Sequence, residues 1–190
     1  MAPLACLLLA GGSTPPPDGT GLILPQEKHF AAMRQLTFGG QNAEGYFSTD
    51  ETKLIFQSTR DSLECDQMFV MDIASGATRM ISTGRGRTTC GYFFPGDTMV
   101  LFSSTHHLLG RCPPKPDFSH GYTWAVTPEY DIFTARPDGS HLRQMTFTPG
   151  YDAEATISPR GNRIVFTSLR HGDLDLYSMN LDGTELGKIP

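Results

Sequence analysis

The densest group of chemically active side chains lies in one proline-rich stretch, residues 104–130. It holds histidine and cysteine, which are zinc-ligand types, and the single tryptophan of the chain. The spacing of His106, His107 and Cys112 matches no standard zinc pattern, and adjacent histidines rarely point at one metal. We therefore predict no metal site and no cofactor. Two interpretations of this long loop remain: a lid that packs on its own sheet, or a lid that contacts a partner.

Three cysteines follow the N-terminal region, and their odd number allows at most one disulfide among them. They are Cys65, Cys90 and Cys112. An exported protein would permit such a bond. Which pair forms is left open by the sequence, and three free thiols are the alternative.

Candidate binding residues share one expected place, the loops and strand starts at one end of the predicted strands. If the strands form a β-propeller, as the repeat described below predicts, this end surrounds the mouth of its central channel. The candidates are Asn42, Glu44, Arg87, Thr88, His106, His107, Trp124, Tyr151, Asp152, Glu154 and His171. Side chains at such a mouth could meet a peptide amine or a cation. The alternative for Asp152 and Glu154 is that they cap backbone N–H groups of the loops. Asp173 and Asp175 lack the dense carboxylate run of a calcium loop, so calcium is not expected there.

The elements that would position these residues repeat along the chain. Matching blocks occupy 45–58, 91–104 and 155–168. They align one phenylalanine column, Phe56, Phe102 and Phe166. Each copy has four strand-like runs joined by turns, which in the third copy fall at about 153–158, 163–168, 174–180 and 185–189. Four antiparallel strands repeated at this period predict an all-β protein, a β-propeller of four-stranded blades.

The third copy carries a family resemblance. Its segment ISPRGNRIVFTSLRHGDLDLYSMNLDG (157–183) closely resembles the propeller repeat of the TolB-like family, which runs roughly S-P-D-G-x-x-I-x-F-x-S, then D-I-Y-x-M-x-x-D-G, then L-T. The resemblance covers about residues 30–190. It departs at Arg160, where the family usually has Asp, and is looser in the first copy. It implies a fold more than a function, because this propeller serves binding proteins, peptidase regulatory domains and some lyases.

The blades are expected to follow an N-terminal leader and a linker. We divide the chain into a leader at 1–12, a Pro/Gly-rich linker at 13–29 and blades at 30–190, with the blades at about 38–82, 83–146 and 147–190. Residues 30–37 match the last strand of one more blade. Propellers close with roughly four to eight blades. Three blades therefore imply a longer gene product, a second chain that completes a six-bladed ring, or an arc that stays open.

The N-terminal leader and the net charge of the chain limit where the protein can be located and what it can bind. Residues 1–12 have an apolar core without the basic start of a full secretory signal. They also resemble a lipoprotein signal in which Gly12 stands in place of the lipidated Cys, so a lipid anchor and a frayed tail are alternatives to an export signal. We expect a periplasmic or extracellular protein. The net charge of -5 predicts no nucleic-acid partner, and no apolar run is long enough to span a membrane.

The function expected first is binding without catalysis. The chain has no G-x-S-x-G, no G-x-x-x-x-G-K-[ST] and no H-E-x-x-H motif. The resemblance implies a propeller, whole or partial, that binds a protein or peptide segment at its channel mouth and loops, and self-association to complete the ring is an open possibility. The alternative is the propeller part of a prolyl-oligopeptidase-like peptidase or of a metal-dependent sugar-acid lyase. A lyase would need several histidines at strand starts, and no histidine stands there.

Overall fold

The computed structural model describes residues 22–122 and 125–190, and within them every regular element is a β-strand. The strands are β1 (Gln41–Phe47), β2 (Lys53–Thr59), β3 (Gln67–Asp72), β4 (Thr78–Met80), β5 (Thr88–Phe93), β6 (Val100–Ser104), β7 (Asp131–Ala135), β8 (Arg143–Gln144), β9 (Asp152–Ile157), β10 (Arg163–Ser168), β11 (Asp175–Asn180) and β12 (Gly187–Lys188).

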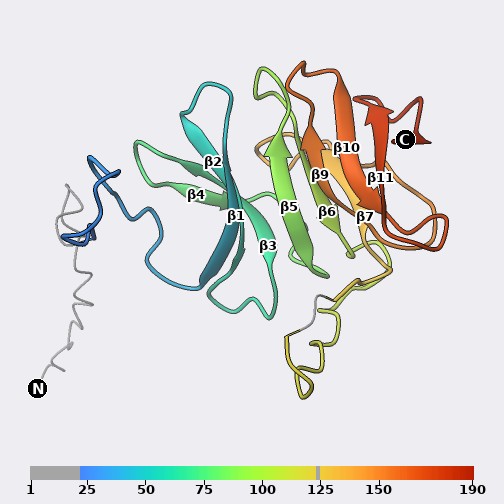
Figure 1. The fold of residues 1–190 in the computed structure, drawn as a ribbon, viewed down its shortest axis with the longest axis horizontal. Coiled ribbons are helices and arrows are strands. Elements are labelled where there is room, and N and C mark those ends of the chain that lie inside the picture. The colour runs from blue at the N-terminus through green and yellow to red at the C-terminus, as the bar shows by residue number, and fades with distance from the viewer. Residues whose placement is uncertain (1–21, 123–124) are drawn as a thin grey trace, which may run out of the picture. The chain divides into compact units, whose positions relative to one another are not determined.

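The strands form three sheets of four strands each, in chain order within each sheet. We call them blade 1 (β1–β4), blade 2 (β5–β8) and blade 3 (β9–β12). Every pairing is antiparallel, and the blades stand side by side in chain order (Figure 1). This confirms the predicted all-β class with four-stranded blades. In blade 3 the observed strands agree with the predicted runs to within a residue or two.

Turn chemistry explains how the first two strands of blade 3 pair. In the turn between β9 and β10, Gly161 takes a φ of +68° and donates its backbone N–H to Ser158 O at 2.7 Å. A left-handed φ is nearly free of cost for glycine and strained for other residues. Pro159 precedes it and favours the bend. The turn therefore brings β10 back along β9 in antiparallel register.

The core lies between neighbouring blades. One cluster joins blade 1 to blade 2 around Ile55, Met68 and Phe102. The next joins blade 2 to blade 3 around Leu101, Ile132 and Phe166. All three members of the phenylalanine column are buried, with exposed fractions between 0% and 2%. Each pairs across strands with an aromatic ring of its own blade, at centroid distances of 5.9, 6.4 and 6.0 Å.

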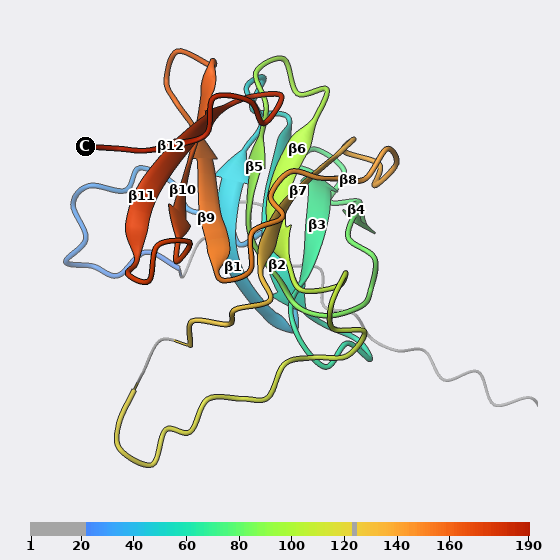
Figure 2. The ribbon, with the colours of Figure 1, turned by 90° about the vertical axis from the view of Figure 1, so that its right-hand side faces the viewer.

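The connections sort to opposite ends of the sheets (Figure 2). The loops between the second and third strands and the links between blades lie at one end, which we call the loop face. Its segments are 60–66, 81–87, 105–130, 145–151 and 169–174. The tight turns lie at the other end, the turn face. The long loop, 105–130, extends from the loop face away from the sheets.

Residues 22–38 form a separate unit in which no strand is assigned. A local turn closes where Glu27 N donates to Leu24 O at 2.9 Å. No strand is assigned at 30–37, the segment whose sequence matches the last strand of a blade. A fourth strand pairs only with the third strand of its own blade, and the described residues before 30–37 supply none. The leader at 1–12, with Cys6 and Gly12, and the first part of the linker lie outside the described residues.

Candidate binding site on the loop face

A pocket of about 430 Å³ opens on the loop face, and we call it the loop-face pocket. Blade 1, blade 2, the long loop and the link into blade 3 all contribute to its wall. Its lining residues are Gln41, Gln57, Asp66, Arg87, Thr88, Thr89, Pro116, Phe118, Tyr122, Ala125, Thr127, Tyr130 and Tyr151. The pocket thus contains one cation, one carboxylate, several hydroxyls and amides, and four aromatic rings.

Hydrogen bonds fix the polar wall of this pocket. Gln57 Oε1 accepts from the Thr89 hydroxyl at 2.9 Å and from Cys90 N at 3.1 Å, which ties blade 1 to blade 2. Asp66 accepts from the Thr59 hydroxyl at 2.6 Å and from Gln57 Nε2 at 3.3 Å. Because these side chains hold one another, the polar wall is organised before any ligand binds, which lowers the entropy cost of binding.

Aromatic rings form the rest of the wall. The buried rings of Tyr130 and Tyr151 meet edge to face, with centroids 5.9 Å apart. Burial raises the pKa of Tyr130 far above its ordinary value, so its hydroxyl stays neutral. On the long loop, the exposed rings of Phe118 and Tyr122 stack with centroids 5.9 Å apart. Rings that present an apolar body and a polar edge are typical of protein-binding surfaces.

The Arg87 guanidinium is available to a ligand. Its backbone is fixed, because Arg87 N donates to the Thr105 hydroxyl and Arg87 O accepts from Thr105 N, both at 3.0 Å. Within residues 22–122 and 125–190 its side chain makes no hydrogen bond or ion pair. It is half-buried and lines the pocket. A guanidinium with free donors is a natural receptor for a carboxylate.

A disulfide pins the start of the long loop to blade 1. Cys65 bonds to Cys112, and this is the single bond expected among the three cysteines. Beside it, Gln67 Nε2 donates to Gly86 O at 2.8 Å and links the same region to the segment that carries Arg87. Cys90 is free, and burial raises the pKa of its thiol to about 11. A thiol with so high a pKa stays protonated and is a poor nucleophile at neutral pH.

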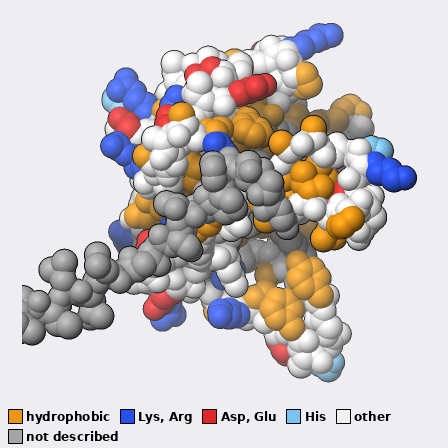
Figure 3. Space-filling model, turned by 90° about the vertical axis from the view of Figure 1, so that its left-hand side faces the viewer, with side chains coloured by type: hydrophobic (Ala, Val, Ile, Leu, Met, Phe, Trp, Pro, Cys, Tyr) orange, Lys and Arg blue, Asp and Glu red, His pale blue; other side chains and the backbone are white. Residues whose placement is uncertain are grey.

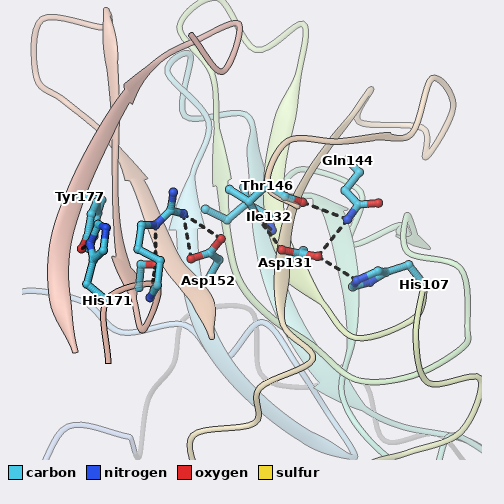
Figure 4. Close-up of polar contacts among 10 residues, drawn as sticks. His107, Asp131, Ile132, Gln144, Thr146, Asp152, His171 and Tyr177 are labelled. Atoms are coloured by element: carbon cyan, nitrogen blue, oxygen red, sulfur yellow. Dashed lines mark hydrogen bonds and ion pairs between the residues drawn. The ribbon is translucent and has the colours of Figure 1, made fainter. Parts of the chain in front are cut away.

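His106 and His107 stand at the base of the long loop, away from the loop-face pocket. Both rings pack on Phe133, at 4.4 and 5.4 Å between centroids. His107 Nε2 is 2.8 Å from Asp131 Oδ2, and the same carboxylate accepts from Thr146 and Gln144 (Figure 4). Burial lowers the pKa of His106 to about 4, with the nearby charges of His107 and Arg85 adding to the shift. These histidines therefore brace the loop.

Two of the predicted channel-mouth residues hold arginines of their own blades. Asp152 lies in β9 and accepts from Arg170 Nη2 at 3.0 and 3.1 Å (Figure 4). Asn42 Oδ1 accepts from Arg60 Nη2 at 3.0 Å. In both blades the arginine lies over the buried aromatic pair, within 5.5 Å of each ring centroid. We call this contact the arginine lock. In blade 2, His106 takes the arginine's place.

The side chains of Asp152 and Glu154 bind other side chains, which differs from the alternative that they cap loop backbone N–H groups. Asp152 binds Arg170, and Glu154 Oε2 accepts from the Thr167 hydroxyl at 2.8 Å within blade 3. Both residues lie inside β9, and their side chains accept from side chains of blade 3: Glu154 from Thr167 of β10, and Asp152 from Arg170 of the loop that follows β10. His171, also a candidate, shares a 2.5 Å hydrogen bond with the Tyr177 hydroxyl.

A second, smaller pocket of about 330 Å³ lies where the first strands of the three blades converge. Glu44, Cys90 and Glu154 occupy the same position in β1, β5 and β9, with φ between +52° and +58°. In β1 and β5 this position falls within a break in the pairing register, and β9 breaks register near it. Such bulges redirect a side chain.

The predicted binding residues thus fall into three groups: those that line the loop-face pocket, those that line the smaller pocket, and those that bind other residues of their own blade. Arg87, Thr88 and Tyr151 meet at the loop-face pocket, whereas Glu44 and Glu154 meet at the smaller one. Trp124 lies outside the described residues. In the described ranges no three His, Cys, Asp or Glu side chains form a group that could hold a metal. There too, no helix is long and apolar enough to cross a membrane.

Several pocket residues were missed by reasoning from the sequence, above all Gln57, Asp66, Tyr130 and the stacked pair Phe118 and Tyr122. Asp66 and Tyr130 each stand directly before a strand of their blade, at the same end as the predicted binding residues. That place was a usable signal. Gln57 lies inside β2 and shows nothing in the sequence that sets it apart.

Comparison with known proteins identifies the repeat, although no family model matches the chain. A stretch of 45 residues, 24% of this chain, is 44% identical to the Tol-Pal system protein TolB of Bordetella pertussis and covers 10% of that protein. A structure of a putative TolB from Agrobacterium tumefaciens superposes with a TM-score of 0.61 at 21% identity, over 80% of this chain and 50% of that one. The three sheets are TolB-like propeller blades.

A TolB from Acinetobacter baumannii gives the same fold, with a TM-score of 0.59 at 16% identity, over 80% of this chain and 33% of that one. The chain thus spans half or less of each of these TolB structures, and its sequence match spans a tenth of the Bordetella protein. The TolB-like blades account for all twelve strands of the described residues. At these identities the structural likeness shows the fold, and the function must be argued from the site.

Proposed function

We propose that this chain is a non-catalytic, protein-binding part of an exported TolB-like propeller, and that it holds a partner's peptide segment in the loop-face pocket. The observation that carries the proposal is the pairing of an unengaged guanidinium, Arg87, with four aromatic rings in one preorganised pocket. A carboxylate of the segment binds Arg87, and an apolar side chain next to it lies against the rings.

Two features support a location outside the cytoplasm. The Cys65–Cys112 disulfide is stable in oxidising compartments and rare in the cytosol. The apolar N-terminal sequence agrees with an export signal.

The Bordetella relative is named as a protein of the Tol-Pal system. We extend that type of role, a protein contact within a Tol-Pal assembly, to this chain as part of the proposal.

The alternative of an enzyme part gains no specific support. A metal-dependent lyase would place histidines on the first strands of the blades. The equivalent positions of β1, β5 and β9 hold Asn42, Thr88 and Asp152, followed by Glu44, Cys90 and Glu154. Amides, carboxylates and a protonated thiol at these places suit structure and binding better than metal-assisted chemistry.

The experiment is a selection of random peptides displayed on phage against the full chain, followed by affinity measurements on synthetic peptides. The proposal predicts enrichment of peptides with a carboxylate beside an aromatic or aliphatic side chain. Arg87→Gln should weaken them about 10- to 100-fold, because a hydrogen bond to a charged group contributes about 1.5–3 kcal/mol. Arg136→Gln, at an exposed position on the turn face, is the matched control and should leave affinity unchanged.

Two outcomes would overturn the proposal. One is the failure of any peptide to enrich. The other is a set of selected peptides that bind the Arg87→Gln variant as well as they bind the native chain. Export is tested separately, by recovering the protein from a Gram-negative host and alkylating it without reduction. Recovery of the protein from the cytoplasmic fraction alone would contradict the proposed location, and Cys65 and Cys112 modified as free thiols in the periplasmic fraction would contradict the disulfide.

A further inference from the structure

Both junctions between blades bury the same positions, and we call these the docking positions. They are the residue before the aromatic residue of the second strand, the residue before that of the third strand, and the residue just after the fourth strand. In blade 1 they are Ile55, Met68 and Ile81, buried against blade 2. In blade 2, Leu101 and Ile132 occupy the first two, and Met145 the third, all buried against blade 3.

Blade 3 carries apolar residues at the same docking positions, the first half-buried and the other two exposed. They are Val165, Leu176 and Ile189. The equivalence rests on backbone geometry, because Ile189 N donates to Leu176 O at 2.9 Å, as Ile81 N does to Met68 O at 2.8 Å. Leu176 is 55% exposed and Ile189 36%, whereas Met68 is 0% exposed. An apolar face of this kind on a folded blade marks a contact surface.

The opposite face of blade 1 is open in a complementary way. Phe47 is 60% exposed, although its equivalent in blade 2, Phe93, is 4% exposed under blade 1. Next to it stands Gly45, the equivalent of Gly91. At Gly91 an added Cβ would come within 2.5 Å of Met68 Sδ, so the glycine makes room for a docking residue of the preceding blade. Hydrophobic side chains are exposed on the side of the molecule that carries blade 1 (Figure 3).

We propose that blade 3 docks on blade 1 of a second copy of this chain, head to tail. Leu176 of each copy lies over Gly45 of the other, as Met68 lies over Gly91 within the chain. The occupant is argued from continuity: the chain itself presents both halves of an interface that it already forms twice internally. Two copies of three blades give six, within the roughly four to eight at which propellers close.

The test measures the molar mass of the full chain by light scattering at two concentrations, with three variants. Leu176→Arg places a charge in the proposed interface from the blade 3 side. Gly45→Arg does so from the blade 1 side. An added Cβ at Gly45 meets only the Leu54 side chain, at 3.6 Å, so the change fits the free chain. Leu142→Arg is the control, since Leu142 is 38% exposed on the turn face of blade 2.

We expect the native chain and the Leu142→Arg variant to show twice the chain mass of 20.8 kDa. Leu176→Arg and Gly45→Arg should each give the monomer. A monomeric native chain would overturn the proposal and assign the blade 3 face to another occupant, such as a further blade of a longer gene product. A dimer that survives Gly45→Arg would overturn the head-to-tail arrangement. Masses that grow beyond two chains would overturn ring closure.

Discussion

Replacing Arg170 by methionine removes the arginine lock of blade 3 while keeping an apolar side chain of similar length. Asp152 would then hold an unpaired carboxylate in a place where its side chain is 2% exposed. The guanidinium that it loses is itself only 10% exposed and also lies 4.8 Å from the centroid of the buried Tyr177 ring. Breaking a buried ion pair from one side costs about 3–5 kcal/mol, because the remaining charge stays desolvated.

Urea unfolding followed by far-UV circular dichroism measures this loss. With a slope of about 2 kcal/mol per molar urea, the midpoint should fall by about 1.5–2.5 M. The matched control is Lys188→Met, which breaks the pair with Asp175, where the side chains are 52% and 30% exposed. A surface pair of this kind contributes about 1 kcal/mol or less, so the control midpoint should move by under 0.5 M, an amount that follows from the same slope.

A double variant separates the unpaired charge from lost packing. Adding Asp152→Leu to Arg170→Met removes the buried charge and should recover at least half of the loss, because a buried pair can often be replaced by apolar residues at little cost. A loss below about 1 kcal/mol for Arg170→Met, or no recovery in the double variant, would refute the electrostatic reasoning for the lock.

Three further predictions concern the core, the loop and pH. Alanine at each position of the phenylalanine column should lower the free energy of unfolding by about 3–5 kcal/mol, and a loss below 1 at all three would contradict the blade register. Cys112→Ser should lower the free energy of unfolding by about 4 kcal/mol, because it removes the bond that closes a loop of 47 residues. Non-reducing peptide mapping of the native chain should confirm the bond to Cys65, and an unchanged melting temperature of the variant would contradict the prediction. Because the pKa of His106 falls to about 4 in the fold against about 6.5 unfolded, stability should drop as pH falls from 6.5 toward 4. His106→Gln should flatten that slope in thermal melts, although the raised pKa of Asp131 acts in the opposite sense, and equal slopes in both proteins would contradict the assignment.

The fold was predictable because the same sequence pattern of strands and turns repeats in each blade. Alternating apolar residues and one aligned phenylalanine per copy, with Pro and Gly in the first turn of the second and third copies, fix the strands, the turns and the face that each strand buries. Residues 30–37, which match a last strand in sequence but form no strand in the structure, show the limit of this reasoning. A strand is stable only against a partner, and a matching sequence of eight residues says nothing about whether that partner is present.

The candidate site was predicted only in part, because its members meet through the order of the blades. Arg87, Thr88 and Tyr151 were predicted from their place at the loop face and do line one pocket. The arginine lock was missed, although Arg60 and Arg170 each stand two residues after the serine, Ser58 or Ser168, that ends the matching block of their copy. The disulfide partner of Cys65 depended on the path of the long loop, which the sequence leaves open.

Hydrogen–deuterium exchange of the chain with a selected peptide tests most directly whether the loop face is the surface that binds. The proposal predicts slower amide exchange on peptide addition at the loop-face pocket, in segments 57–66, 87–89 and 116–122, with the turns at 49–52 and 136–140 unchanged. Slower exchange confined to the turn face, or to the exposed side of β11, would contradict it.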